Sequence, residues 1–181
     1  MDARRGSELS PMKNRTTVER KSERELVVTR TFDGPARLVF EAWTKPELFK
    51  RWWIPKSFPV SLLSCEMDVR VGGGYRLLFG NGDAEPKPFF GKYIEVTPPS
   101  RLVWTNDEDH GGGAVTTVTF EEKGGKTLVV MHDLHHSKEG LDEALGSYDA
   151  IGETFDQLDE VLVTPAAGAS QPLTASSRRT S

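Results

Sequence analysis

Residues 137–163 read SKEGLDEALGSYDAIGETFDQLDEVLV, and this stretch decides the fold. Its apolar residues recur every three or four positions, which is the spacing of one face of an α-helix. They are Leu141, Leu145, Tyr148, Ile151, Phe155, Leu158 and Leu162. Acidic residues occupy the other face, and Ser137 is the expected N-cap. We predict one long amphipathic helix, in which Gly146 and Gly152 indicate close packing or a hinge.

The partner of this helix is predicted from six strand-like runs that precede it. The runs are separated by turn clusters of Gly, Asn, Asp and Pro, with the spacing of an antiparallel meander. They are 60–69, 74–79, 89–96, 101–105, 115–121 and 127–134. The plainest hairpin turn is Glu122–Lys126, which reads EKGGK.

A seventh strand is expected at 25–32, and two short helices follow it. The first covers 36–44 after Pro35, and the second starts at Pro46. The predicted fold is therefore α+β, with a curved seven-stranded antiparallel sheet wrapped around a long C-terminal helix. A curved sheet that grips one helix leaves space for a cavity between the two.

The distribution of charge divides the chain into a domain and two tails. Residues 1–24 carry a formal charge of +3 and residues 163–181 carry +2, and both are expected to be disordered tails. Residues 25–162, the predicted domain, carry −9. An acidic domain repels phosphate backbones, so nucleic acid is not an expected partner. Whether Met1 or Met12 is the physiological start stays open.

Composition excludes several other classes of protein. No run of about 18 apolar residues is present, so no membrane span is expected. The basic N-terminus lacks the apolar core of a secretory signal, and the single cysteine, Cys65, excludes an internal disulfide. We expect a cytoplasmic protein without a cofactor. A homodimer through an edge strand or an exposed helix is possible.

Three motifs then resemble a known family. They are residues 46–55 (PELFKRWWIP), 65–76 (CEMDVRVGGGYR) and 91–105 (GKYIEVTPPSRLVWT). In this order they resemble the START-like (SRPBCC) superfamily, and within it the group related to the C-terminal domain of the activator of the heat-shock-protein-90 ATPase. The resemblance implies a helix-grip fold with a deep, mostly apolar pocket. Such bacterial members often have Gly-Trp where this chain has Ala150-Ile151, which should enlarge or reshape the pocket.

Strand alternation gives the residues expected to line the pocket. Alternate residues share a face, and we place Tyr75 and Phe79, Trp104, Phe120, and His132 with Leu128 and Val130 on the concave face. The expected ligand-binding residues are Trp53, Tyr75, Phe79, Trp104, Phe120, His132, Tyr148, Ile151 and Phe155. A filled core without a ligand is the alternative. His132 and His135 point to opposite faces of a strand, so no metal site is expected there.

Three functions fit this pattern. The leading hypothesis is binding of an apolar small molecule, such as a lipid, a polyketide or an aromatic metabolite. The second is a cyclase or dehydrase in which His132 transfers a proton together with Tyr75 or Tyr148. The third, a co-chaperone-like activator of a chaperone ATPase, is implied by the resemblance alone.

Overall fold

The computed structural model describes residues 15–81, 85–107 and 113–163. These residues form one eight-stranded antiparallel sheet and four helices. The strands are β1 (Thr17–Arg20), β2 (Glu25–Phe32), β3 (Ser61–Met67), β4 (Gly74–Gly80), β5 (Lys87–Thr97), β6 (Arg101–Asn106), β7 (Ala114–Lys123) and β8 (Lys126–His135). The helices are α1 (Ala36–Thr44), α2 (Pro46–Phe49), α3 (Lys138–Tyr148) and α4 (Ile151–Val163).

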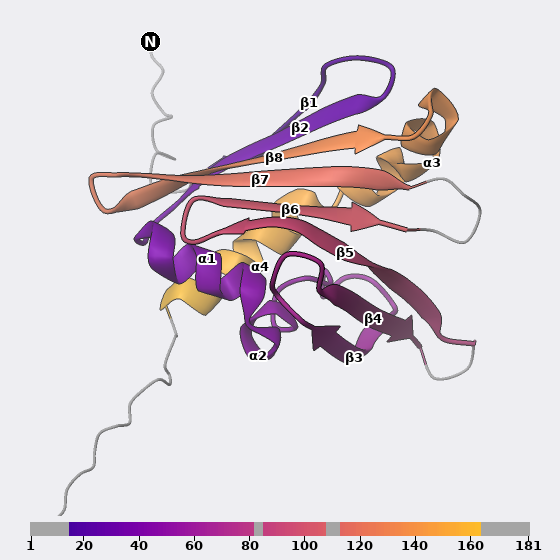
Figure 1. The fold of residues 1–181 in the computed structure, drawn as a ribbon, viewed down its shortest axis with the longest axis horizontal. Helices are drawn as coiled ribbons and strands as arrows, with labels where there is room; N and C mark the ends of the chain where they lie inside the picture. The colour runs from indigo at the N-terminus through magenta and orange to yellow at the C-terminus, as the bar shows by residue number, and fades with distance from the viewer. Residues whose placement is uncertain (1–14, 82–84, 108–112, 164–181) are drawn as a thin grey trace, which may run out of the picture.

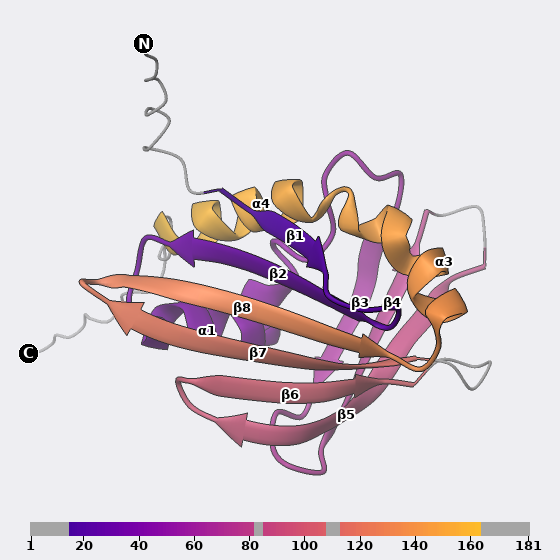
Figure 2. The ribbon, with the colours of Figure 1, turned by 90° about the horizontal axis from the view of Figure 1, so that it is seen from above.

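The sheet has the order β1-β2-β8-β7-β6-β5-β4-β3. Strand β5 pairs with β4 over its first half and with β6 over its second half, and the register shifts between Tyr93 and Glu95. The sheet therefore bends at β5. It curves around α4, and α1 and α2 lie beside that helix (Figures 1 and 2). This arrangement confirms the predicted α+β architecture.

All seven predicted strands and both short helices are present, but the strand count was one too low. The additional strand, β1, lies in the stretch 1–24 that we expected to be a tail. Its four residues are exposed and two of them are charged, so no hydrophobic pattern marks it. It forms because it pairs with β2, with Val18 opposite Val28. The remaining tail residues, 1–14 and 164–181, lie outside the described residues.

The prediction of one long terminal helix was also wrong in detail. Two helices are present, and the chain turns between them at Asp149 and Ala150. The Ser137 side chain accepts a hydrogen bond from the Gly140 backbone N–H at 3.0 Å, which confirms the predicted N-cap. The break lets α3 pack against β8 while α4 packs against α1. Among the described residues, no helix is long and apolar enough to span a membrane.

The solid part of the core lies between α1, α4 and the centre of the sheet. The Trp43 ring is its centre, with the Trp52 ring at 4.8 Å, the Phe120 ring at 6.0 Å and the Phe155 ring at 6.2 Å. Such edge-to-face contacts pack aromatic rings at interior density. This end of the molecule is therefore filled.

Candidate functional site

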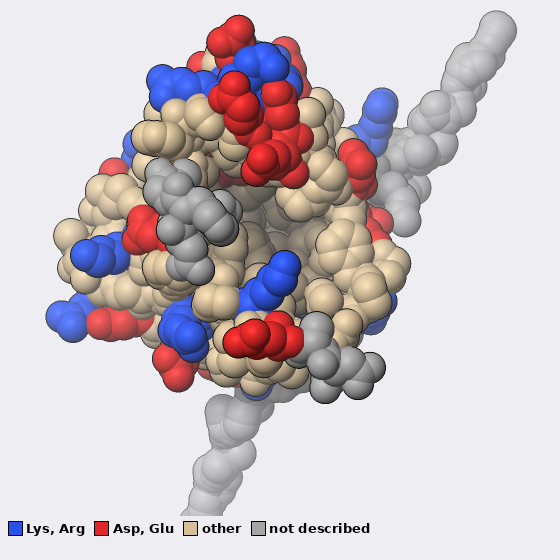
Figure 3. Space-filling model, turned by 90° about the vertical axis from the view of Figure 1, so that its right-hand side faces the viewer, with Lys and Arg blue, Asp and Glu red and all other residues tan. Residues whose placement is uncertain are grey.

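A cavity of about 350 Å³ lies at the other end, between the sheet, α3, the start of α4 and residues 53–60. Figure 3 shows a depression on this face of the molecule. The volume falls in the range of small-molecule sites. Trp53 and Trp104, which pack against Trp43 of the filled core, line this cavity, so the structure combines a filled half with a hollow half.

One side of the cavity is apolar. The segment after α2 contributes Trp53, Ile54, Pro55, Phe58 and Val60, and the sheet contributes Phe79, Phe89 and Trp104. Because strands β4, β5 and β6 alternate their side chains between two faces, each presents aromatic rings to the same space. This side can bury the apolar body of a ligand.

The segment after α2 has no regular structure, and Gln157 of α4 holds it in place. The Gln157 side-chain amide donates to the backbone oxygens of Trp52 at 3.1 Å and Ile54 at 2.9 Å. Its oxygen accepts from the Lys56 backbone N–H at 2.8 Å. Gln157 is itself buried. One side chain thus satisfies three backbone groups and positions part of the apolar wall.

The opposite side carries a polar cluster, which consists of Thr116, Asp133, His135 and Tyr148. The Thr116 hydroxyl donates to Asp133 at 2.5 Å, and the Tyr148 hydroxyl donates to the other carboxylate oxygen. Nε2 of His135 lies 3.1 Å from the Tyr148 oxygen. Because the Tyr148 hydroxyl donates its only proton to Asp133, its oxygen is the acceptor in the hydrogen bond with His135. The cluster is a continuous hydrogen-bonded chain.

Burial dominates the electrostatics of the polar cluster. Asp133 is only 7% exposed, and burial raises its pKa although the hydrogen bonds from Thr116 and Tyr148 oppose that rise. The pKa of Tyr148 is also raised, first by burial and then by the Asp133 charge. Both groups therefore favour their neutral forms more than in water. The arrangement can share or transfer a proton at the cavity wall.

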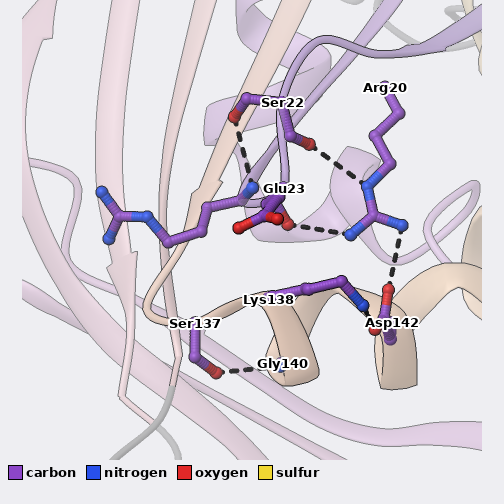
Figure 4. Close-up of polar contacts among 8 residues, drawn as sticks. Arg20, Ser22, Glu23, Ser137, Lys138, Gly140 and Asp142 are labelled. Carbon is purple, nitrogen blue, oxygen red and sulfur yellow. Dashed lines mark hydrogen bonds and ion pairs between the residues drawn. The ribbon is translucent and has the colours of Figure 1, made fainter.

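Helix α3, which carries Tyr148, is tied to the turn between β1 and β2 (Figure 4). The Arg20 side chain donates to the backbone oxygens of Ser22 at 3.2 Å and Glu23 at 2.8 Å, and it pairs with Asp142 at 2.9 Å. Lys138 pairs with Asp142 at 2.7 Å. The hydrogen bond from Lys138, followed by that from Arg20, lowers the pKa of Asp142. These contacts hold α3 beside the open end of the sheet.

The structure brings five of the predicted site residues to the cavity: Trp53, Phe79, Trp104, Tyr148 and Ile151. Three others lie elsewhere on the same face of the sheet or on α4. Tyr75 borders a smaller gap of about 20 Å³ and donates to the Thr105 backbone oxygen at 2.7 Å. Phe120 and Phe155 are packed in the filled core and do not line the cavity.

His132, the ninth predicted residue, lies on the opposite face of β8. Its Nε2 atom is 2.9 Å from a Glu25 carboxylate oxygen, outside the cavity. The residues of β8 that face inward are Thr127, Val129, Met131, Asp133 and His135. Our assignment of this strand was therefore wrong by one residue. A one-residue error exchanges the two faces of a strand.

The inward-facing Asp133 and His135 were missed, although the sequence contained a signal for them. The EKGGK turn has its two glycines at positive φ, Gly124 at 63° and Gly125 at 82°. A two-residue turn pairs Lys123 with Lys126 and hence Phe120 with Val129. Directly opposite residues share a face, so Val129 and its alternate neighbours lie on the face of Phe120, which we predicted to be the concave one.

Comparison with known proteins agrees with this architecture. The family described as Activator of Hsp90 ATPase homolog 1-like protein matches residues 33–163. The chain belongs to this family. A comparison with curated proteins gave no match.

Solved structures of the same fold come from several bacteria. A Nitrosomonas europaea protein is 25% identical, with a TM-score of 0.71 over 79% of this chain and 96% of its own. A Rhodobacter sphaeroides protein is 20% identical, with a TM-score of 0.73 over 83% of this chain and 99% of its own. A Mycobacterium smegmatis protein is also 20% identical, with a TM-score of 0.69 over 83% and 99%. These likenesses support the fold of this chain.

Proposed function

We propose that this member of the Activator of Hsp90 ATPase homolog 1-like family binds an apolar small molecule that carries one polar group. The observation that supports the proposal is the cavity of about 350 Å³, with an aromatic side and a polar cluster facing each other. A pocket of this kind is the usual form of a small-molecule site. Lipids, polyketides and aromatic metabolites fit its chemistry. The resemblance of three sequence motifs to the START-like superfamily, which implies a deep and mostly apolar pocket, supports the same proposal.

The cavity can be tested with a variant that fills it. Ile151, at the position where the resemblance leads us to expect Trp, lines the cavity and is half-buried. We expect Ile151→Trp to place an indole in this space, to fold normally and to weaken binding at least about tenfold. Native mass spectrometry and thermal shifts against a library of lipids and aromatic metabolites measure binding by both proteins.

The control for this experiment is a variant outside the cavity. Glu25→Gln changes a half-exposed side chain on the far face of the sheet and should leave binding unchanged. A ligand at one hundred times its dissociation constant stabilises a protein by about 2.7 kcal/mol, which a thermal shift resolves easily. Equal shifts for the native chain and Ile151→Trp would contradict the assignment of the cavity. So would the absence of any ligand in the library.

A second function, proton-transfer catalysis of the cyclase or dehydrase kind, is supported by the polar cluster. The form of this hypothesis that used His132 fails, since His132 pairs with Glu25 on the other face. Asp133, Tyr148 and His135 can take its place as groups that hold and move a proton. Tyr148→Phe should then retain ligand binding and lose turnover. Retention of turnover by this variant would remove Tyr148 from the mechanism.

A further inference from the structure

We propose that the cavity selects uncharged molecules whose polar group is a hydroxyl, such as an alcohol or a phenol, and rejects carboxylates. This inference rests on the proposed function and concerns the identity of the ligand. It is carried by the position of the polar cluster, which holds the one carboxylate of a mostly apolar cavity, and by the absence of Lys and Arg among the described residues that line it.

The two sides of the cavity set the orientation of a ligand. The polar cluster comes from β7, β8 and α3, whereas Trp53, Phe79 and Phe89 come from the segment after α2 and from strands β4 and β5. A molecule with one polar end therefore places that end against Asp133 and Tyr148, and its body against the rings. The reverse orientation would leave a polar ligand atom without a partner in an aromatic environment, which costs about 1–3 kcal/mol.

A hydroxyl suits the polar cluster in either protonation state. Each carboxylate oxygen of Asp133 accepts one hydrogen bond, from Thr116 or Tyr148, and each has a further lone pair. A ligand hydroxyl can donate to an ionised Asp133 or accept from a protonated one. Burial raises the pKa of Asp133, which favours its neutral form more than in water.

A carboxylate ligand has no comparable partner. It would lose its hydration on entry, and no cationic Lys or Arg lines the described cavity to compensate. His135 is the one lining group among the described residues that can become a cation, and its Nε2 atom is engaged by Tyr148. An ionised Asp133 would repel the ligand. Figure 3 shows Lys and Arg side chains near the rim of the depression, where water screens their charge.

Matched pairs of ligands test the inference. Decanol with decanoate, and naphthol with naphthoate, share their apolar bodies and differ in the charge of the polar group at neutral pH. Trp53 and Trp104 line the cavity, so tryptophan fluorescence reports binding, and calorimetry gives the affinities. We expect the hydroxyl compound of at least one pair to bind native protein at least about tenfold more tightly than its acid.

Two variants connect the selectivity to Asp133. Asp133→Asn removes the carboxylate at nearly constant volume and should lower the ratio of the two affinities at least about threefold, because the repulsion of the ligand carboxylate is lost. The lack of Lys and Arg among the described lining residues should keep the ratio above one. Glu25→Gln removes one carboxylate from the far face of the sheet and should leave the ratio as in the native chain. Circular dichroism checks that Asp133→Asn is folded, and if it is not, the ratio measured with the native chain decides the selectivity by itself.

The possible outcomes separate this inference from the proposed function. If the carboxylates bind as tightly as the hydroxyl compounds, the selectivity is overturned and the binding function stands. If a pair discriminates in the native chain and equally in Asp133→Asn, the role of Asp133 is overturned. If no member of either pair binds, both the selectivity and the binding of single-headed apolar molecules are overturned.

Discussion

Gln157 is the residue on which the apolar side of the cavity depends. Its side chain is the partner of three backbone groups in a segment that has no strand or helix of its own. A polar residue in the buried stripe of α4 would be unfavourable by itself, and these hydrogen bonds offset the cost. The same contacts determine where Trp53 stands relative to the cavity.

We therefore expect Gln157→Leu to lower the free energy of unfolding by about 2–4 kcal/mol, because it leaves buried backbone groups without partners. Urea unfolding measures the change. Glu153→Gln is the control: Glu153 accepts from the exposed Ser57 N–H at 2.9 Å, and a glutamine oxygen can keep this contact. If Gln157→Leu lowers the free energy of unfolding no more than Glu153→Gln does, the proposed role of Gln157 in anchoring the segment after α2 is contradicted.

Asp133 should make stability depend on pH. Burial raises its folded-state pKa above the ordinary value of about 4. Folded protein then holds this proton to higher pH than unfolded protein, so the contribution of Asp133 to stability is greatest below about pH 4 and is lost as pH rises through the folded pKa. Relative to Asp133→Asn, the native chain should become less stable as the pH rises from about 4 through the folded pKa.

Urea unfolding of both proteins across this range measures the difference. The comparison is informative because the asparagine side chain of the variant does not titrate and the other acids are shared. A native chain that instead gains stability relative to the variant with rising pH would show that Thr116 and Tyr148 outweigh burial and lower the pKa.

At the scale of elements, strand β5 produces the bend of the sheet. Gly91 lies in β5 opposite Tyr75 of β4. A Cβ atom at this position would meet the Thr105 backbone oxygen of β6 at 1.8 Å. Only glycine permits this approach, since the obstacle is backbone and cannot rotate away. Strand β5 can therefore pair with β4 at one end and with β6 at the other.

The helical glycines behave differently. We expected Gly146 and Gly152 to mark close packing or a hinge, but no atom lies within 4 Å of a Cβ built at either position. Close packing is therefore not their role. The chain does turn between α3 and α4, at Asp149 and Ala150, which lie between the two glycines.

Two alanine substitutions should thus have opposite effects. Gly91→Ala should destabilise by about 3 kcal/mol or more, because the sheet must open to admit the methyl group. Gly146→Ala should stabilise by about 0.5–1 kcal/mol, because alanine lowers the backbone entropy lost in a helix. Thermal unfolding of both variants measures these changes. The interpretation fails if both shift the midpoint in the same direction.

At the scale of the whole molecule, β1 protects one edge of the sheet. It pairs with β2 along residues 26–29, and Arg30 of β2 contacts the Thr16 side chain at 3.0 Å. Without β1, the unpaired backbone groups of β2 would be open to another chain. Residues 17–20, which resemble part of a tail in composition, are therefore a strand of the sheet.

Removal of residues 1–24 should lower the thermal midpoint and cause self-association. Light scattering after size exclusion, compared with the full chain at equal concentration, measures the second effect. If the truncated chain has the same mass distribution and the same thermal midpoint as the full chain, β1 does not protect the edge of the sheet. The chain that starts at residue 15 retains β1 and is the matched control.

Local chemistry alone determined most of the architecture. Apolar spacing located the strands and the terminal helical region, and turn residues located most of their boundaries, because alternation and helical periodicity are properties of short segments. The two-residue turn at Gly124 and Gly125 even contained the register that places Asp133 inward. That information was available without coordinates, although alternation by itself could not distinguish the two faces of β8.

Only the tertiary structure decided how the molecule is filled. The four exposed residues of β1 become a strand through pairing with β2, and the terminal helix divides because α3 follows β8 while α4 follows α1. Phe120 lies on the same face of the sheet as Trp104, and Phe155 belongs to helix α4, yet both phenylalanines fill the core and Trp104 borders the cavity. Periodicity specifies the direction of a side chain, whereas empty space depends on how distant elements meet.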